Sequence, residues 1–293
     1  MKRSNHRFLP ILSLLVTATL WGLVWYPLRK LDAQGMDGLW VSLVSYAGAL
    51  LLGSRWLWRS RADWRDSGLL LALMAIGVGW CNVAFILAVL DGTVVRVLLL
   101  FYLSPLWAVI LGWLLLGEHP GYQGLIVFVL AITGAVTMLW DPAIGLPWPR
   151  GDADWLAVSS GFSFAFANVM VRKMHAVSLQ SKSAANWLGV VLVAGAWILA
   201  ANQPVPVVSY PVWAGAVLLG WFGFLIMTVT VIYGVTHMPL HRSAVILLFE
   251  LVVGAVSALL LTDEQVLPRE WLGGGLILMA AYLTAHAQVG ESK

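Results

Sequence analysis

One acidic side chain, Glu250, lies near the middle of a long apolar stretch of the sequence. An ionised carboxylate at the centre of a bilayer costs about 2.5–3.5 kcal/mol on insertion scales, so we expect Glu250 to face protein or water. It could bind a cation, relay protons or join two helices through its carboxyl group. Because no acidic or histidine residue neighbours it in the sequence, we favour a structural or substrate-contact role over a proton relay.

A second candidate group follows a four-residue spacing near the N-terminus. Thr17, Trp21 and Trp25 recur every four residues and therefore share one face of a helix. The same spacing returns 143 residues later, where Phe164 and Asn168 correspond to the two tryptophans. Small residues, which let helices approach closely, run beside both series at Ala18, Gly22, Gly161 and Ala165. One face of each helix is thus expected to pack while the other lines a cavity, although aromatic side chains that only fill the bundle or face lipid are equally compatible.

Polar and aromatic residues also interrupt the apolar stretch around residue 80. Trp80, Asn82 and Phe85 lie within it, and the side-chain amide of Asn82 must find a hydrogen-bond partner inside a membrane. For Asn82 alone, a bond that joins two helices is slightly favoured over substrate contact. All three residues are retained as candidates for substrate binding.

The next apolar stretch carries a tyrosine, a serine and a proline in close succession. Tyr102 is near its centre, so the hydroxyl group either bonds another helix or faces water. Ser104 occupies the position that corresponds to Glu250 in the second half of the chain. Pro105 removes one backbone hydrogen bond and is expected to bend the helix, so we treat it as a hinge.

The elements that position these residues follow from composition. The chain has 293 residues, of which 60% are hydrophobic and 11% charged, whereas a soluble domain carries roughly 25% charged residues. A helix that crosses a bilayer needs about 20 apolar residues and satisfies its own backbone hydrogen bonds. We therefore predict an all-α integral membrane protein with ten transmembrane helices, at residues 8–28, 38–54, 67–90, 93–116, 122–140, 155–174, 184–201, 211–235, 240–262 and 270–287. The first stretch could be a secretory signal, but its length and its internal counterpart favour a retained helix.

The second half of the sequence repeats the first. Arg96 and Glu118 align with Arg242 and Glu264 at an offset of 146, and residues 20–31 align with 163–174. Because each copy contains five predicted helices, the two copies must cross the membrane in opposite directions. Inverted repeats are typical of secondary transporters, which bind substrate near the midplane between the repeats. We assign the first repeat to 1–140, a connecting loop to 141–154 and the second repeat to 155–293, around a central cavity.

The positive charges predict the orientation of the chain. With the N-terminus in the cytoplasm, 12 Lys and Arg residues fall on the inner side and 5 on the outer side, which places both termini in the cytoplasm. Cys81 is the single cysteine, so an intrachain disulfide is impossible, and no Cys/His spacing suggests a metal site. No basic patch supports nucleic-acid binding, and no cofactor is expected. The expected partners are a small-molecule substrate and the lipid bilayer.

The repeated segments resemble those of a known group of transporters. In EamA-type exporters of the drug/metabolite transporter superfamily, the fourth and ninth helices carry a Glu-Pro pair followed by an apolar run that ends in Gly-Glu. Here Ser104-Pro105 retains the proline, Glu250-Leu251 retains the acid, and Gly117-Glu118 retains the ending. YLSPLW at 102–107 is similar to the Tyr-Leu-X-Pro segment of bacterial aromatic amino-acid exporters. The resemblance implies that helices 1, 3, 4, 6, 8 and 9 enclose the cavity while helices 5 and 10 stand aside, and it implies export of amino acids.

Together these observations predict an inner-membrane secondary transporter that exports amino acids, including aromatic ones, and similar amphipathic metabolites by alternating access. The candidate substrate-binding residues are Trp21, Trp25, Trp80, Asn82, Phe85, Tyr102, Ser104, Phe164, Asn168 and Glu250. Facilitated export and proton antiport both stay open, because the sequence offers no sodium site, nucleotide-binding loop or strong proton pathway.

Three other functions remain as alternatives. The same fold could export another metabolite or drug class, and a channel would carry similar polar residues along its pore. An integral-membrane enzyme is less favoured, because no HExxH or GxSxG motif is present. The nearest acidic cluster, DWRD at 63–66, lies in an arginine-rich loop that topology already explains.

Overall fold

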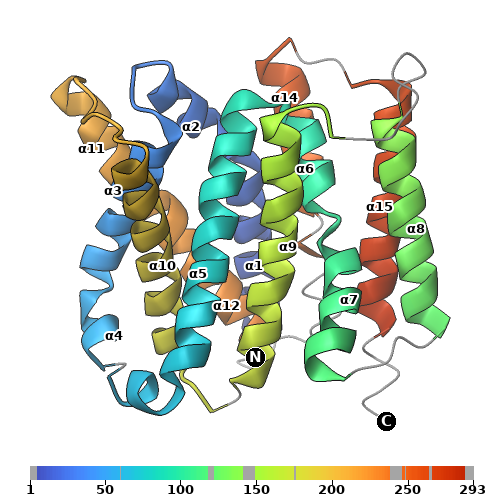
Figure 1. The fold of residues 1–293 in the computed structure, drawn as a ribbon, viewed down its shortest axis with the longest axis horizontal. Helices are drawn as coiled ribbons and strands as arrows, with labels where there is room; N and C mark the ends of the chain where they lie inside the picture. Colours follow the sequence, from blue (N-terminus) through green and yellow to red (C-terminus); the bar gives the residue numbers. More distant parts are fainter. Residues whose placement is uncertain are drawn as a thin grey trace.

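The protein is a bundle of helices that run side by side between two ends, called the upper end and the lower end as drawn in Figure 1. The computed structural model describes residues 5–59, 61–117, 122–140, 149–174, 176–237, 246–247, 249–263 and 266–287. All regular secondary structure within these segments is helical. The predicted all-α class is therefore confirmed.

The first half of the chain crosses the bundle back and forth between these two ends (Figure 1). Short segments at the upper end connect α2 to α3 and α5 to α6, while α4 lies at the lower end. The helices of the first half are α1 (Asn5–Leu23), α2 (Trp25–Asp32), α3 (Gly38–Leu52), α4 (Ser54–Arg59), α5 (Arg61–Asp91), α6 (Val94–Phe101), α7 (Ser104–Leu116) and α8 (Tyr122–Leu139).

The second half alternates in the same way. Its elements are α9 (Asp152–Lys173), α10 (Leu179–Ala200), α11 (Tyr210–Leu218), the π-helical turn η1 (Leu219–Phe224), α12 (Leu225–His237), α14 (Phe249–Leu261) and α15 (Pro268–Ala287). Each of the ten predicted apolar stretches overlaps one of these elements or two or three consecutive ones. Most of the connecting loop lies outside the described segments. Three residues of the repeat alignment do too: Glu118, Arg242 and Glu264.

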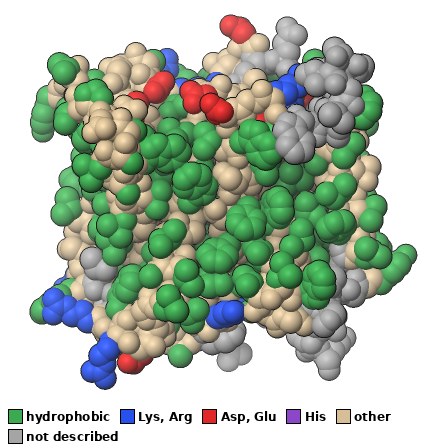
Figure 2. All heavy atoms as spheres, in the orientation of Figure 1, with side chains coloured by type: hydrophobic (Ala, Val, Ile, Leu, Met, Phe, Trp, Pro, Cys, Tyr) green, Lys and Arg blue, Asp and Glu red, His purple; other side chains and the backbone are tan. Residues whose placement is uncertain are grey.

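The surface of the bundle is that of a membrane protein. Five helical stretches are long and apolar enough to cross a bilayer: 9–32, 61–91, 94–116, 179–200 and 210–231. Shorter apolar helices add Gly38–Leu52, Leu125–Thr137 and Phe249–Leu261. Figure 2 shows a broad band of hydrophobic side chains across the middle, with Lys, Arg, Asp and Glu gathered toward the two ends. This distribution matches a chain that crosses the membrane several times.

Three helices are interrupted inside the bundle. The predicted bend before Pro105 is a complete break, because α6 ends at Phe101 and α7 begins at Ser104. Pro105 falls in the first turn of α7, where its missing N–H requires no partner. Two further irregularities were not predicted from the sequence: the turn at Val24 that separates α1 from α2, and the π-helical turn η1.

Glycines bring backbones together at two similar contacts between the halves. A Cβ atom on Gly22 would lie 2.7 Å from the carbonyl oxygen of Glu250, and one on Gly161 would lie 2.6 Å from that of Phe101. Ala18 and Ala165 beside them are also buried. The predicted packing role of the small residues is confirmed, because it is their side-chain size that lets α1 meet α14 and α9 meet α6.

Helices α8 and α15 pack against each other at one edge of the bundle (Figure 1). Gly134 of α8 approaches the carbonyl oxygen of Gly273 in α15, where a Cβ atom would come within 2.6 Å. These are the fifth and tenth apolar stretches of the sequence. The pair stands beside the other helices, as the family resemblance implies.

We predict that Gly22→Ala destabilises the protein by about 1–3 kcal/mol, because the added methyl group must displace the α14 backbone. Gly275→Ala is the matched control, since a Cβ atom there meets nothing within 4 Å and alanine favours the helix. Thermal unfolding of both variants in detergent measures the difference. Equal melting temperatures for the two variants would contradict the close packing of α1 on α14.

Candidate functional site

A partly buried polar contact joins the two halves of the chain at the break between α6 and α7. The hydroxyl group of Tyr102 donates a hydrogen bond of 3.0 Å to Oε2 of Glu250 in the first turn of α14. Glu250 is only 4% exposed and Ser104, two residues beyond Tyr102, is 8% exposed. We call the pair Tyr102 and Glu250 the central junction. It brings together two of the candidate residues from opposite halves of the sequence.

Aromatic rings extend from the central junction along the break. The ring of Phe101 lies 5.7 Å from that of Tyr102, 5.3 Å from that of Phe85 and 5.4 Å from that of Phe164, measured between centroids. These four residues form the aromatic cluster. Phe101 was not identified as a candidate residue from the sequence. Its position four residues before Pro105 was the signal that could have identified it. The cluster offers an apolar surface beside a buried carboxyl group, which suits a ligand with both apolar and polar parts.

Trp25 connects α2 to α14 instead of standing beside an open space in this conformation. Its indole Nε1 donates to the Ser257 hydroxyl over 3.0 Å, and the side chain is 2% exposed. Ser257 in turn donates to the backbone carbonyl of Gly22 over 3.3 Å. Thr17, on the same face of α1, shares a hydrogen bond of 2.6 Å with Thr230 of α12. This face of α1 and α2 therefore joins the first helices to the second half of the chain.

Asn82 binds a neighbouring helix from its place in α5. The Tyr46 hydroxyl of α3 donates to its side-chain oxygen over 2.5 Å, and its amide donates to the Val78 carbonyl oxygen over 2.9 Å. Asn82 thus makes the helix-joining bond that the sequence slightly favoured.

Trp80, on the same helix, connects α5 to two others. Its Nε1 donates to the Ser159 hydroxyl of α9 over 3.2 Å, and its ring stacks on that of Trp197 of α10 at 5.3 Å. Within the described segments, no hydrogen bond or ring contact joins Trp80 or Asn82 directly to the central junction. Trp21 is half-buried against the main hydrophobic core.

The candidates on α9 lie nearer to the surface. Phe164 is 36% exposed although its ring contacts Phe101, and Asn168, one turn further on, is exposed. Of the predicted residues, Phe164 therefore belongs to the aromatic cluster, whereas Asn168 points away from the buried part of the bundle.

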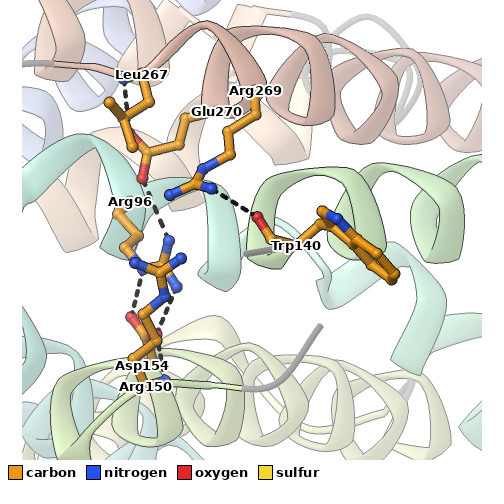
Figure 3. A network of polar contacts seen from close by, with 7 residues as sticks. All are labelled: Arg96, Trp140, Arg150, Asp154, Leu267, Arg269 and Glu270. Carbon is orange, nitrogen blue, oxygen red and sulfur yellow. Dashed lines mark hydrogen bonds and ion pairs between the residues drawn. The ribbon is translucent and has the colours of Figure 1, made fainter. Parts of the chain in front are cut away.

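A network of ion pairs joins three helices near the upper end of the bundle (Figure 1 and Figure 3). The Arg96 guanidinium of α6 donates to both carboxylate oxygens of Asp154 in α9, over 2.8 and 2.7 Å. It also donates to Glu270 of α15 over 3.2 Å. All three side chains are nearly buried, with exposures of 12% or less. We call these residues the upper-end network; it joins the beginnings of three helices.

Backbone groups complete this network. The N–H of Arg150 donates to Asp154 over 2.9 Å, and the N–H of Leu267 donates to Glu270 over 3.0 Å. In the sequence, Arg96 marked the repeat and the outer side of the membrane, but neither acidic partner was identified. Asp154 and Glu270 each lie near the start of an apolar stretch, beside an exposed turn. That position was the signal in the sequence that could have identified them.

The acidic segment 63–66 has a structural role at the lower end. Asp63 accepts hydrogen bonds from the hydroxyl groups of Ser178 and Ser181, over 2.9 and 2.5 Å. Ser178 precedes α10 and Ser181 lies in its first turn. Asp63 therefore connects the start of α5 to the start of α10.

Two hollows lined by described residues are peripheral. One, of about 210 Å³, is an apolar groove between the α1–α2 turn and η1. The other, of about 420 Å³, lies beside Trp140 and Arg269 near the upper end. Neither includes a candidate substrate-binding residue. In this conformation Glu250 and Ser104 are buried and Tyr102 is half-buried.

These features define a class of protein: a multi-pass helical membrane protein with a buried polar contact between two halves, as in transporters. The EamA-like transporter family matches the chain twice, at residues 8–140 and 152–285. Since these matches cover most of the sequence, the chain belongs to the EamA-like transporter family. The family resemblance seen in the sequence is confirmed.

Individual relatives are more distant. The chain is 31% identical to Protein RarD of Salmonella typhi over 129 residues, which cover 44% of this chain and 41% of that protein. It is 29% identical to Protein RarD of Escherichia coli K12 over 131 residues, again 41% of that protein's length. The chain thus matches about two-fifths of these curated relatives. One solved crystal structure superposes on this chain with a TM-score of 0.59, and the match covers 92% of this chain and 94% of the solved chain. Because the two sequences are only 16% identical, this likeness shows a shared fold alone.

We predict that Asp154→Ala lowers the free energy of unfolding by roughly 3–5 kcal/mol, because it leaves the nearly buried Arg96 guanidinium without its bidentate partner. Asp152→Ala in the same helical turn is the control, since Asp152 is exposed and a surface change of this kind stays within about 0.5 kcal/mol. Chemical unfolding in detergent compares the two variants. A similar stability for both would show that the upper-end network contributes little.

Proposed function

We propose that this protein is a secondary transporter that exports amino acids, including aromatic ones, and similar small amphipathic metabolites by alternating access. The observation that carries the proposal is the central junction. There the Tyr102 hydroxyl, at the helix break of the first half, meets the buried Glu250 carboxyl group of the second half. Aromatic rings adjoin it. Broken helices beside a polar midplane site are typical of secondary transporters.

The proposed topology is ten membrane crossings in two inverted repeats of five, at 1–140 and 155–293, joined by residues 141–154. In Figure 1, α1 runs from the lower to the upper end, whereas α9 runs from the upper to the lower end. The glycine contacts support the same relation, because Gly22 packs α1 on α14 just as Gly161 packs α9 on the end of α6. Similar contacts in both halves are expected of a repeated fold.

We propose that the protein lies in the inner membrane of the cell. Its lower end would face the cytoplasm, with both termini on that side. Exposed arginines gather there on α4 and at the start of α5, at Arg55, Arg59, Arg61 and Arg65. Positive residues concentrate on the cytoplasmic side of membrane proteins. The upper-end network would then lie on the outer side.

The proposed path for substrate passes the central junction and the aromatic cluster. Aromatic rings there, including that of Tyr102, would stack on an apolar side chain, while the Ser104 hydroxyl would bond the polar end of the substrate. The other candidates hold helices together or lie at the surface in this conformation, and would contact substrate once the helices separate: Trp21, Trp25, Trp80, Asn82 and Asn168. Pro105 would act as the hinge of this movement.

Counterflow in proteoliposomes tests the proposal. Purified protein is reconstituted with unlabelled amino acids inside, and the entry of labelled phenylalanine, methionine and threonine is followed with and without a pH gradient. Saturable counterflow that ignores the gradient would support facilitated export, and gradient-driven counterflow would indicate proton coupling. If none of the three is exchanged, the amino-acid proposal is wrong.

We predict that Tyr102→Ala reduces counterflow about tenfold or more, the equivalent of about 1.4 kcal/mol, because it removes a ring and a hydroxyl group from the path. Tyr122→Ala is the matched control, since Tyr122 is 78% exposed on α8. Trp25→Ala should also reduce counterflow, while Trp58→Ala at an exposed position of α4 should not. Membrane insertion, measured by yield and monodispersity, should be retained in all four. Unchanged counterflow in both Tyr102→Ala and Trp25→Ala would place the path elsewhere.

A further inference from the structure

We propose that Glu250 recognises a protonated amine of the substrate, which takes the place of the Tyr102 hydroxyl on the carboxylate. The inference rests on the proposed function and names its substrate class: primary amines that carry an apolar or aromatic group. On this account a carboxyl group on the substrate is tolerated but not required. A ligand with a carboxylate and no amine is rejected.

The surroundings of Glu250 carry the argument. The side chain is 4% exposed, and a carboxylate removed from water is stabilised by a cation or by several hydrogen bonds. Among the described residues its hydrogen-bond partner is Tyr102, a single neutral donor. Arg65 pairs with another acid at the surface, and Arg96 pairs with acids of the upper-end network. Within the described segments Glu250 has no ion-pair partner, which leaves its carboxylate open to a cationic ligand.

The rings beside the junction favour the same ligand. Phe101 lies between Tyr102 and Phe164, with centroids 5.7 and 5.4 Å away, so aromatic faces continue from the carboxylate toward the surface of α9. An ammonium group is attracted to such faces, and the attraction grows where water is excluded. The apolar remainder of the substrate would pack on Phe85 and Phe101. One end of the site thus suits a cation and the other an apolar group.

Tyr102 would act as a stand-in for the ligand. Its hydroxyl satisfies one oxygen of Glu250 while the site is empty, which avoids leaving a buried acceptor without a partner. An incoming ammonium group forms a charge-assisted hydrogen bond, which is stronger than the bond from a neutral hydroxyl. The exchange therefore favours the amine over the empty state.

Ligand binding by the full chain in detergent tests this, with isothermal titration of 2-phenylethylamine, 3-phenylpropionate and phenylalanine. We expect the wild type to bind the amine and phenylalanine but not the acid. Glu250→Gln keeps a carbonyl oxygen for Tyr102 and removes only the charge, so it should weaken amine binding at least tenfold. Asp66→Asn, an exposed acid on α5, is the control and should bind as the wild type does. Equal binding of the acid and the amine, or amine binding that survives in Glu250→Gln, would overturn the inference.

Tyr102→Phe provides a second test that keeps the carboxylate and the ring. Because the amine no longer competes with the hydroxyl, we expect it to bind about threefold to tenfold more tightly. Weaker or unchanged binding would show that Tyr102 does not occupy the place of the ligand.

The readout of both tests is binding, so a protein that binds the amine but shows no counterflow refutes the proposed function alone. A protein that exchanges phenylalanine yet binds acids equally well refutes this inference alone.

Discussion

The break between α6 and α7 is the constraint on which the centre of the structure depends. Pro105 has no N–H to give to the carbonyl of Phe101, so the helix cannot continue through this point. That carbonyl faces Gly161, where any side chain would collide with it. The interruption leaves Tyr102 at the end of α6, where its hydroxyl reaches Glu250 of the other half. The aromatic cluster is then assembled around Phe101, the last residue before the break.

Polar contacts elsewhere divide into two kinds. Asn82 with Tyr46 joins helices within the first half, and Trp187 with Thr228 does the same within the second half. Trp25 with Ser257, the central junction and the upper-end network join one half to the other. If the halves rock against each other, contacts of the first kind can persist as each half moves, whereas those of the second kind must break or rearrange. On that mechanism, the bonds between the halves would set the balance between conformations.

Local features could be predicted from the sequence, and features that depend on distant partners could not. Hydrophobic length located the helices, and residue size predicted the packing of Gly22 and Gly161, because both depend on properties of nearby residues. Pro105 predicted a bend at this point for the same reason, and the structure shows a break there. The partners of Arg96 escaped prediction since Asp154 and Glu270 lie on other helices, whose arrangement the sequence does not state. The π-helical turn η1 also escaped, because it accommodates the contact of Gly220 with the α3 backbone.

On the proposed mechanism, the break between Tyr102 and Ser104 opens to water and contacts substrate during transport. Ser104→Cys in a Cys81→Ala background, which removes the single native cysteine, tests it most directly. Proteoliposomes would be treated with a membrane-impermeant maleimide, with and without saturating phenylalanine. We predict that the thiol is modified during turnover and that phenylalanine slows its modification several-fold. Modification that phenylalanine does not affect, or a thiol that never reacts while counterflow proceeds, would contradict the account.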